Sequence, residues 1–288
     1  MQVGSTKSGI SRLVGVTVGV IGIFLGGAAV SHAQRIWRGG YGFTPPRFPT
    51  PTSFAGSFNF CRVMFTSNRR EKQGWSTDYP GADINFSIRL SELTKTDVKL
   101  DREEGEGDTP DAVVVRLTDE ALFHCPFVLM EDAGTAHFSE PEVVRLREFL
   151  LKGGFLLAAD YHGTRARAQF DDEIGHVLPP NRYPIVDLTP PTHAMWNTLF
   201  PVKQVPQMAS IQTWRRTGGV LERWNDDRSG PDARGIADEH GRLMVVTLHN
   251  TDIPDGWERE GEDHEYFFRY SPDAYAVGID VLLYSMTH

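Results

Sequence analysis

The apolar residues of this chain alternate between strand-like and helix-like spacing. An aromatic and β-favouring run at 58–65 ends in a polar stretch, which predicts a first strand. A helix is predicted over 82–94, behind Gly81, because apolar residues recur there every three or four positions. Two short strands follow at 98–100 and 112–115, separated by an acidic, glycine-rich loop. The apolar face of the helix is assigned to Ile84, Ile88 and either Leu90 or Leu93.

The clearest unit is a strand, a helix and a second strand. Residues 127–130 form a continuous apolar run suited to a strand buried on both faces. Ser139 and Glu142 form a capping box at the start of a helix that Gly153 and Gly154 end. A second buried strand is predicted at 155–159. The short connections predict a right-handed parallel crossover.

The last third of the chain continues the alternation. A short helix is predicted within 190–200 and a strong strand at 242–249. A closing helix is predicted to begin with Ser271 as N-cap and Pro272 at its first position. The alternation predicts an α/β protein, a three-layer α/β/α sandwich around a mainly parallel sheet.

The N-terminal segment has the order of a signal peptide. Lys7 and Arg12 precede an uncharged apolar run at 13–30, and Ser31 and Ala33 then supply small side chains at the −3 and −1 positions of a cleavage site, so cleavage is predicted after Ala33. An uncleaved membrane anchor is the alternative, although the run is at the lower limit for spanning a bilayer and is diluted by glycine. The prediction is therefore an exported protein of the periplasm or cell envelope.

Composition divides the remaining chain into a tether and one domain. Residues 34–53, rich in proline, glycine and arginine, are predicted to be a tether, and 54–288 a single α/β domain. Removal of residues 1–33 takes away two positive charges, so the formal net charge changes from −9 to −11. This acidity, without a basic stripe or zinc-finger spacing, argues against nucleic acid as a partner.

Cys61 and Cys125 are the two cysteines of the chain. Each stands at the beginning of a predicted strand, and this position favours two small buried thiols. A disulfide is the alternative in an exported protein, provided that the two strands are neighbours.

Three motifs carry a resemblance to a known family. Residues 75–86, 153–160 and 250–258 together resemble domain of unknown function family 4159. The resemblance implies a class I glutamine amidotransferase-like fold, which is a flavodoxin-type sandwich. Asp160 stands where true amidotransferases of this fold have their catalytic cysteine, and a carboxylate cannot form the thioester. The resemblance therefore implies a protein without glutaminase chemistry.

Polar residues directly after predicted strands are the candidate site, because parallel sheets bind ligands beyond the carboxyl ends of their strands. Asp160 and His249 are the candidate catalytic residues. The candidate ligand-binding residues are Trp75, Asp78, Asp83, His162 and Asp252. Glu131, Asp132 and Asn250 also follow strands. A single Asp at a strand end is more often a cap or turn former than a catalyst, so this structural alternative stays open.

Two further chemistries receive little support from the pattern. The histidines, including His193, come from separate loops without compact ligand spacing, so the sequence predicts no metal and no cofactor. A serine triad lacks the G-x-S-x-G elbow. The first hypothesis is an envelope module that binds a polar small molecule, a carbohydrate or peptide, or another envelope protein. The alternative is a hydrolase using Asp160, a histidine and a second carboxylate, Asp252 or Glu258.

Overall fold

A seven-stranded sheet forms the centre of the protein. The computed structural model describes residues 44–68, 74–101, 109–222, 226–227 and 229–288. Five neighbouring strands run parallel, and β9 and β10 extend the sheet antiparallel. The predicted α/β class with a mainly parallel sheet is confirmed. In spatial order the strands are β5 (Ala112–Arg116), β1 (Phe60–Met64), β6 (Phe127–Met130), β8 (Phe155–Tyr161), β11 (Leu243–His249), β10 (Asp232–Ala237) and β9 (Ile185–Asp187).

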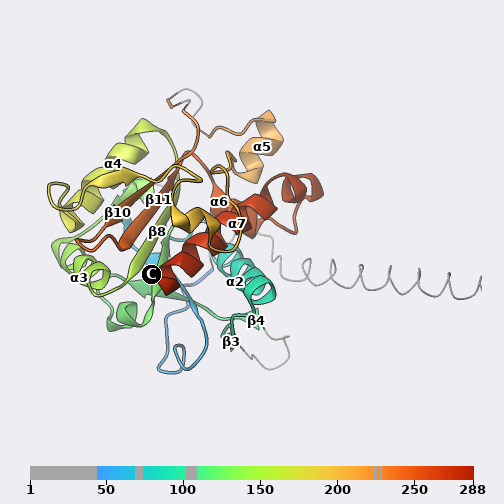
Figure 1. Cartoon of the computed structure of the whole chain (residues 1–288). Helices are drawn as coiled ribbons and strands as arrows, with labels where there is room; N and C mark the ends of the chain where they lie inside the picture. The colour runs from blue at the N-terminus through green and yellow to red at the C-terminus, as the bar shows by residue number, and fades with distance from the viewer. Residues whose placement is uncertain (1–43, 69–73, 102–108, 223–225, 228) are drawn as a thin grey trace, which may run out of the picture.

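Helices cover both faces of this sheet (Figure 1). The helices α2 (Gly81–Thr94), α6 (Ile253–Glu258) and α7 (His264–Thr287) bury apolar side chains against one face. The helices α3 (Glu140–Leu151) and α4 (Gly163–Val177) pack on the other face. The remaining short elements are β2 (Thr66–Ser67), β3 (Leu100–Asp101), β4 (Thr109–Pro110), η1 (Glu120–His124), η2 (Ala133–Thr135), β7 (Ala136–His137), η3 (Ala194–Asn197) and α5 (Ile211–Thr217).

The predicted strand–helix–strand unit is present as β6, α3 and β8. The capping box forms, with the Ser139 amide donating to Glu142 Oε2 at 2.8 Å. Gly153 has a φ of 111°, and a Cβ on Gly154 would lie 2.4 Å from the Phe149 ring. Both glycines are therefore required where the chain leaves α3 and enters β8. β6 and β8 pair parallel, as the crossover predicts.

The start predicted for the closing helix is wrong. α7 begins at His264 with Asp263 as N-cap, and Ser271 and Pro272 lie inside the helix. Asp263 Oδ1 accepts the amides of Glu265 and Tyr266 at 3.0 Å each. The Tyr266 side chain is fully buried, and its packing holds the turns that precede the proline. Tertiary contacts thus override a proline signal that is only local.

Two smaller expectations also need correction. The segment 190–200 forms a 3₁₀ turn, η3, in place of a short α-helix. In α2 the buried apolar residues are Ala82, Phe86 and Leu90, whereas Ile84 and Ile88 are only partly buried. The helix was predicted correctly, but its inward face is rotated because Phe86 packs against Phe60 and Trp257.

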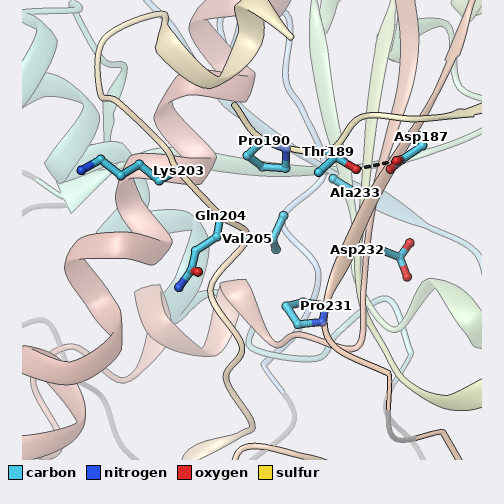
Figure 2. Close-up of a pocket in the computed structure, with 9 residues that line it drawn as sticks. All are labelled: Asp187, Thr189, Pro190, Lys203, Gln204, Val205, Pro231, Asp232 and Ala233. Atoms are coloured by element: carbon cyan, nitrogen blue, oxygen red, sulfur yellow. Dashed lines mark hydrogen bonds between the residues drawn. The ribbon is translucent and has the colours of Figure 1, made fainter. Parts of the chain in front are cut away.

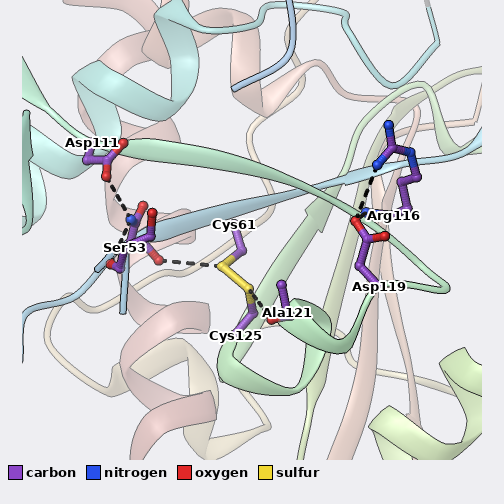
Figure 3. Close-up of a disulfide and its surroundings, with 8 residues drawn as sticks. Ser53, Cys61, Asp111, Arg116, Asp119, Ala121 and Cys125 are labelled. Atoms are coloured by element: carbon purple, nitrogen blue, oxygen red, sulfur yellow. Dashed lines mark hydrogen bonds and ion pairs between the residues drawn. A yellow bond between two sulfur atoms is a disulfide. The ribbon is translucent and has the colours of Figure 1, made fainter. Parts of the chain in front are cut away.

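Cys61 and Cys125 form a disulfide, so the expectation of two free thiols is wrong (Figure 3). Cys61 lies in β1 and Cys125 directly precedes β6, and these strands are neighbours in the sheet. Their Cα atoms are 6.1 Å apart, within the range that a disulfide can bridge. The bridge ties the first strand to the chain entering the third parallel strand.

The described part of the predicted tether, from residue 44 onward, lies against the edge of the sheet. Val114 in β5 donates its amide to the Arg47 carbonyl at 2.8 Å, and Arg47 pairs with Asp111 at 3.1 Å. The predicted signal or anchor at 1–33 lies outside the described residues. Among the helices that the structure describes, none has the length and apolarity needed to cross a bilayer.

Candidate functional site

The carboxyl ends of the parallel strands gather the polar candidates. From β1 the chain passes through α2 to the edge strand β5, and then returns to the opposite side of β1 as β6. The direction of strand addition therefore reverses between β1 and β6, the place where open α/β sheets form a crevice. The loops after β1, β6, β8 and β11 lie at this edge.

Asp160, His162 and Asp252 form one cluster at this edge. His162 Nε2 lies 3.3 Å from Asp160 Oδ1, and one ligand atom from each of the three residues falls within 4.8 Å of the others. Asp160 is the next-to-last residue of β8 and has a φ of 49°. His162 is the N-cap residue of α4, and Asp252 is the N-cap residue of α6. The side chains of Asp160 and His162 are 15% and 9% exposed. Two loops that are distant in sequence thus present two carboxylates and an imidazole together.

Asp252 is the most perturbed member of this cluster. Burial raises its pKa well above the usual value for Asp, and the negative charges of Asp160, Asp255 and Glu222 raise it further. Its side chain caps α6 by accepting the Asp255 amide at 3.1 Å. The position is thus a buried acid next to other acids, in which a proton or a cation is favoured.

A second cluster, formed by Asp78, Asp255 and Glu258, lies close by. One carboxylate oxygen from each residue falls within 4.8 Å of the others. Burial raises the pKa of Glu258 to about 7. The pKa of Asp78 is also raised well above its usual value, first by burial and then by the negative charge of Glu258. Arg259 Nε lies 2.6 Å from Glu258 and 3.4 Å from Asp255, so this second cluster has its own cation.

Asp83 lies beneath the site and does not face a ligand. It is fully buried and accepts hydrogen bonds from the equally buried Arg62. Arg62 also donates to Glu131 Oε2 at 2.6 Å, and to the carbonyls of Trp75 and Thr77 at 3.2 and 2.8 Å. This guanidinium therefore holds the loop that carries Trp75 and Asp78 over the end of β1. The role of Asp83 is to position Arg62.

Glu131 completes this buried arrangement. One arginine cannot balance two carboxylates, and Asp83 takes the two-pronged contact. Burial raises the pKa of Glu131 to about 8 although Arg62 lowers it. Glu131 Oε1 is buried and accepts no hydrogen bond from the residues that the structure describes. Burial therefore favours the protonated form of Glu131.

The imidazole beside Asp160 belongs to His162, whereas His249 has other partners. His249 is fully buried, and its Nε2 lies 3.2 Å from the Gly163 carbonyl. Its Nδ1 lies 2.6 Å from Arg167 and 3.3 Å from Asp232. These contacts fix the start of α4 against β11. The geometry thus gives His249 a positioning role for the turn that carries His162.

Trp75 lies in the loop after β1 and packs against the core on the side of α3 and α4. Its ring lies 5.6 Å from that of Tyr79, and Tyr79 accepts the Arg47 amide at 3.1 Å.

The sequence pattern missed Arg62 and Asp255. An arginine in the middle of an apolar strand is a detectable signal, because a buried charge needs a buried partner. Asp255 carried no comparable signal, since acidic residues are ordinary in a first helical turn.

A separate cavity of about 280 Å³ opens on the antiparallel side of the sheet (Figure 2). None of the predicted site residues lines it. In the figure, Lys203 and Asp232 point to opposite sides, with Val205 and Pro231 between them. Its lining residues are Asp187, Thr189, Pro190, Lys203, Gln204, Val205, Pro231, Asp232 and Ala233.

These features define an α/β protein with an acidic, imidazole-containing site at the carboxyl edge of a mainly parallel sheet. The family described as Domain of unknown function (DUF4159) matches residues 60–286. The chain belongs to this family, as the motif resemblance predicted. No curated protein matches the sequence.

Proposed function

We propose that this protein is an exported envelope protein that binds a polar ligand, a carbohydrate or a peptide, at the carboxyl edge of its sheet. The observation that carries the proposal is the convergence of Asp160, His162 and Asp252 within 4.8 Å. A few polar groups that converge at one place, as these do, are typical of polar-ligand sites.

The proposal includes a class I glutamine amidotransferase-like, flavodoxin-type fold without glutaminase activity. Numbered among themselves, the five parallel strands have the order 2-1-3-4-5, which is the flavodoxin order. Asp160 stands at the strand end where the resemblance implies a cysteine. Both cysteines of the chain are bonded to each other, and this supports a function other than thiol catalysis.

Export is supported by two features that are independent of each other. The order of charges and apolar residues before residue 34 is that of a signal peptide. The disulfide between Cys61 and Cys125 is typical of an oxidising compartment. An N-terminal anchor would place the same domain at the membrane surface.

A hydrolase is the second candidate, because the same cluster contains an acid–base set. Asp160 Oδ1 lies 3.3 Å from His162 Nε2, and burial raises the pKa of Asp252 well above the usual value for Asp. A carboxyl group with a raised pKa beside a carboxylate–imidazole pair is an arrangement that can separate a general acid from a general base. Hydrolysis is the reaction class that such a pair supports.

Thermal melting of the purified chain tests both candidates. Chitooligosaccharides, maltooligosaccharides and di- and tripeptides are added singly, since a ligand of the folded state raises the melting temperature by mass action. The wild type and Asp187→Asn, a control in the separate cavity, are expected to respond to the same compound, whereas Asp160→Asn is not. Product formation from that compound would favour the hydrolase. A response that survives in Asp160→Asn and is lost in Asp187→Asn would refute the proposed site.

A further inference from the structure

We infer that Asp160, His162 and Asp252 bind one divalent transition-metal ion, of the Zn²⁺ or Mn²⁺ type. The donor set is one imidazole nitrogen and two carboxylate oxygens from the ends of the neighbouring strands β8 and β11. Three protein ligands with further positions left for water or substrate are the usual set of catalytic zinc sites. The imidazole among the donors favours zinc over calcium or magnesium, and the two carboxylates also suit manganese.

The spacing of the donors fits such an ion. The three ligand atoms lie within 4.8 Å of one another. Two ligands that are each about 2.1 Å from a tetrahedral zinc ion are about 3.4 Å apart. Asp160 Oδ1 and His162 Nε2, which are 3.3 Å apart, already match this spacing. Both side chains reach the surface, so they can rotate to close a larger gap to Asp252.

The second, independent observation is the state of the Asp252 carboxylate. The residue is only 4% exposed and makes no ion pair with any described lysine or arginine. One oxygen accepts the Asp255 amide at 3.1 Å. A buried carboxylate without a cation beside it is costly to ionise. A metal ion is a ligand that would supply the missing positive charge.

The helix N-termini at this cluster repel a cation, but this repulsion is weaker than the attraction from the two carboxylates. His162 and Asp252 stand at the N-termini of α4 and α6. Each helix N-terminus carries a partial charge of about +0.5 at most, whereas the two carboxylates carry two full negative charges when a cation displaces the proton from Asp252. The balance at the cluster therefore favours a divalent ion.

The neighbouring cluster of Asp78, Asp255 and Glu258 is a poorer metal site. Its donors are all carboxylates, and Arg259 Nε already lies 2.6 Å from Glu258. A resident guanidinium would repel a second cation. The inference is therefore restricted to the cluster that contains the imidazole.

Calorimetric titration of the EDTA-treated and dialysed full chain with ZnCl₂, and separately with MnCl₂, tests the inference. One ion per chain is expected to bind. His162→Gln and Asp252→Asn are each expected to weaken binding at least tenfold. Asn retains the oxygen that caps α6. His137→Gln is the matched control, because His137 also lies beside a carboxylate, 2.9 Å from Glu173, but has no third ligand.

Melting curves recorded in EDTA show whether each variant folds like the wild type, and only variants that do are compared. Binding that is unchanged in His162→Gln, binding that is lost equally in His137→Gln, or no binding at all would overturn the inference. The inference rests on the proposed function only in one respect, since the metal ion and the polar ligand are placed at the same edge of the sheet. A ligand response that persists in EDTA without any metal binding would refute the metal and leave the proposed function standing. Metal binding without any response to a ligand would refute the proposed function and leave the metal site standing.

Discussion

Glu131→Gln is the substitution that tests the buried arrangement beneath the site most directly. In the wild type the Glu131 carboxyl shares Arg62 with Asp83 and has a pKa of about 8. Glutamine keeps the shape of a protonated glutamate, and its amide oxygen can still accept from Arg62. The variant is therefore expected to fold like the wild type but to lose one pH-dependent contribution to stability.

The sign and size of that contribution follow from the raised pKa. Between the usual value of 4.5 and the folded value of about 8, the folded state holds a proton that the unfolded state has lost. The stabilisation of the protonated form is thus complete below pH 4.5 and is lost as the pH rises through 8. From pH 6 to pH 9 the loss amounts to about 3 kcal/mol, from roughly two pH units at about 1.4 kcal/mol each.

Urea unfolding followed by circular dichroism at pH 6 and pH 9, without reductant, measures this loss. The wild type is expected to lose about 3 kcal/mol more than Glu131→Gln over this interval, a difference of about 1 M in midpoint for a slope near 3 kcal/mol/M. Glu140→Gln, an exposed position on α3, controls for the change in charge. Equal losses in the wild type and Glu131→Gln would refute the assignment of a buried, protonated Glu131.

Two further predictions concern the cysteines and the absent thiol chemistry. The double variant Cys61→Ser, Cys125→Ser is expected to lose about 4 kcal/mol of unfolding free energy, because the bridge spans 64 residues of the chain. A loss below about 1 kcal/mol in urea unfolding would contradict this. The purified chain is expected to release no ammonia from glutamine, since Asp160 replaces the nucleophile. Ammonia release that Cys125→Ser abolishes would overturn the second prediction.

The parts of the fold that the sequence predicted correctly are those where local signals and packing agree. The unit from β6 to β8 has two continuous apolar runs, a capping box and a glycine stop, and each of these acts within a few residues. The closing helix differs, because Pro272 is a strong local signal for a helix start. The buried Tyr266 outweighs that signal, and only the folded core reveals it.

The elements that were missed lack an apolar pattern that stands out. α4 contains the charged stretch Thr164–Arg167, which hides its inward residues Phe170 and Ile174. β10 holds Arg234 and Gly235 between its few apolar residues, so it resembles a loop. Its antiparallel pairing with β11 is a long-range choice that no local window contains.

The sequence likewise predicted one part of the candidate site and missed another part. The rule that loops after parallel strands share one edge brought Asp160, His162 and Asp252 together correctly. The rule could not separate His162 from His249, because both follow a strand. Which imidazole meets Asp160 depends on side-chain direction, and His249 turns toward Arg167 and Asp232. Asp83 was misassigned for a similar reason, since the buried Arg62 attracts it inward.

Backbone strain and buried acids coincide at this edge, and the coincidence argues for function. Among the described residues, the non-glycine residues with a positive φ are Asp78, Lys95, Asp132, Asp160 and Asn250. Lys95 is the C-cap of α2, whereas the other four end or follow β1, β6, β8 and β11 at the carboxyl edge. Left-handed backbone costs on the order of 1 kcal/mol even where Asp and Asn soften it. The nearby carboxyl groups of Asp252 and Glu131 are also costly to bury. Two independent costs in one place are unexpected for a feature that only stabilises the fold, and they are expected where the fold holds polar groups ready for a ligand.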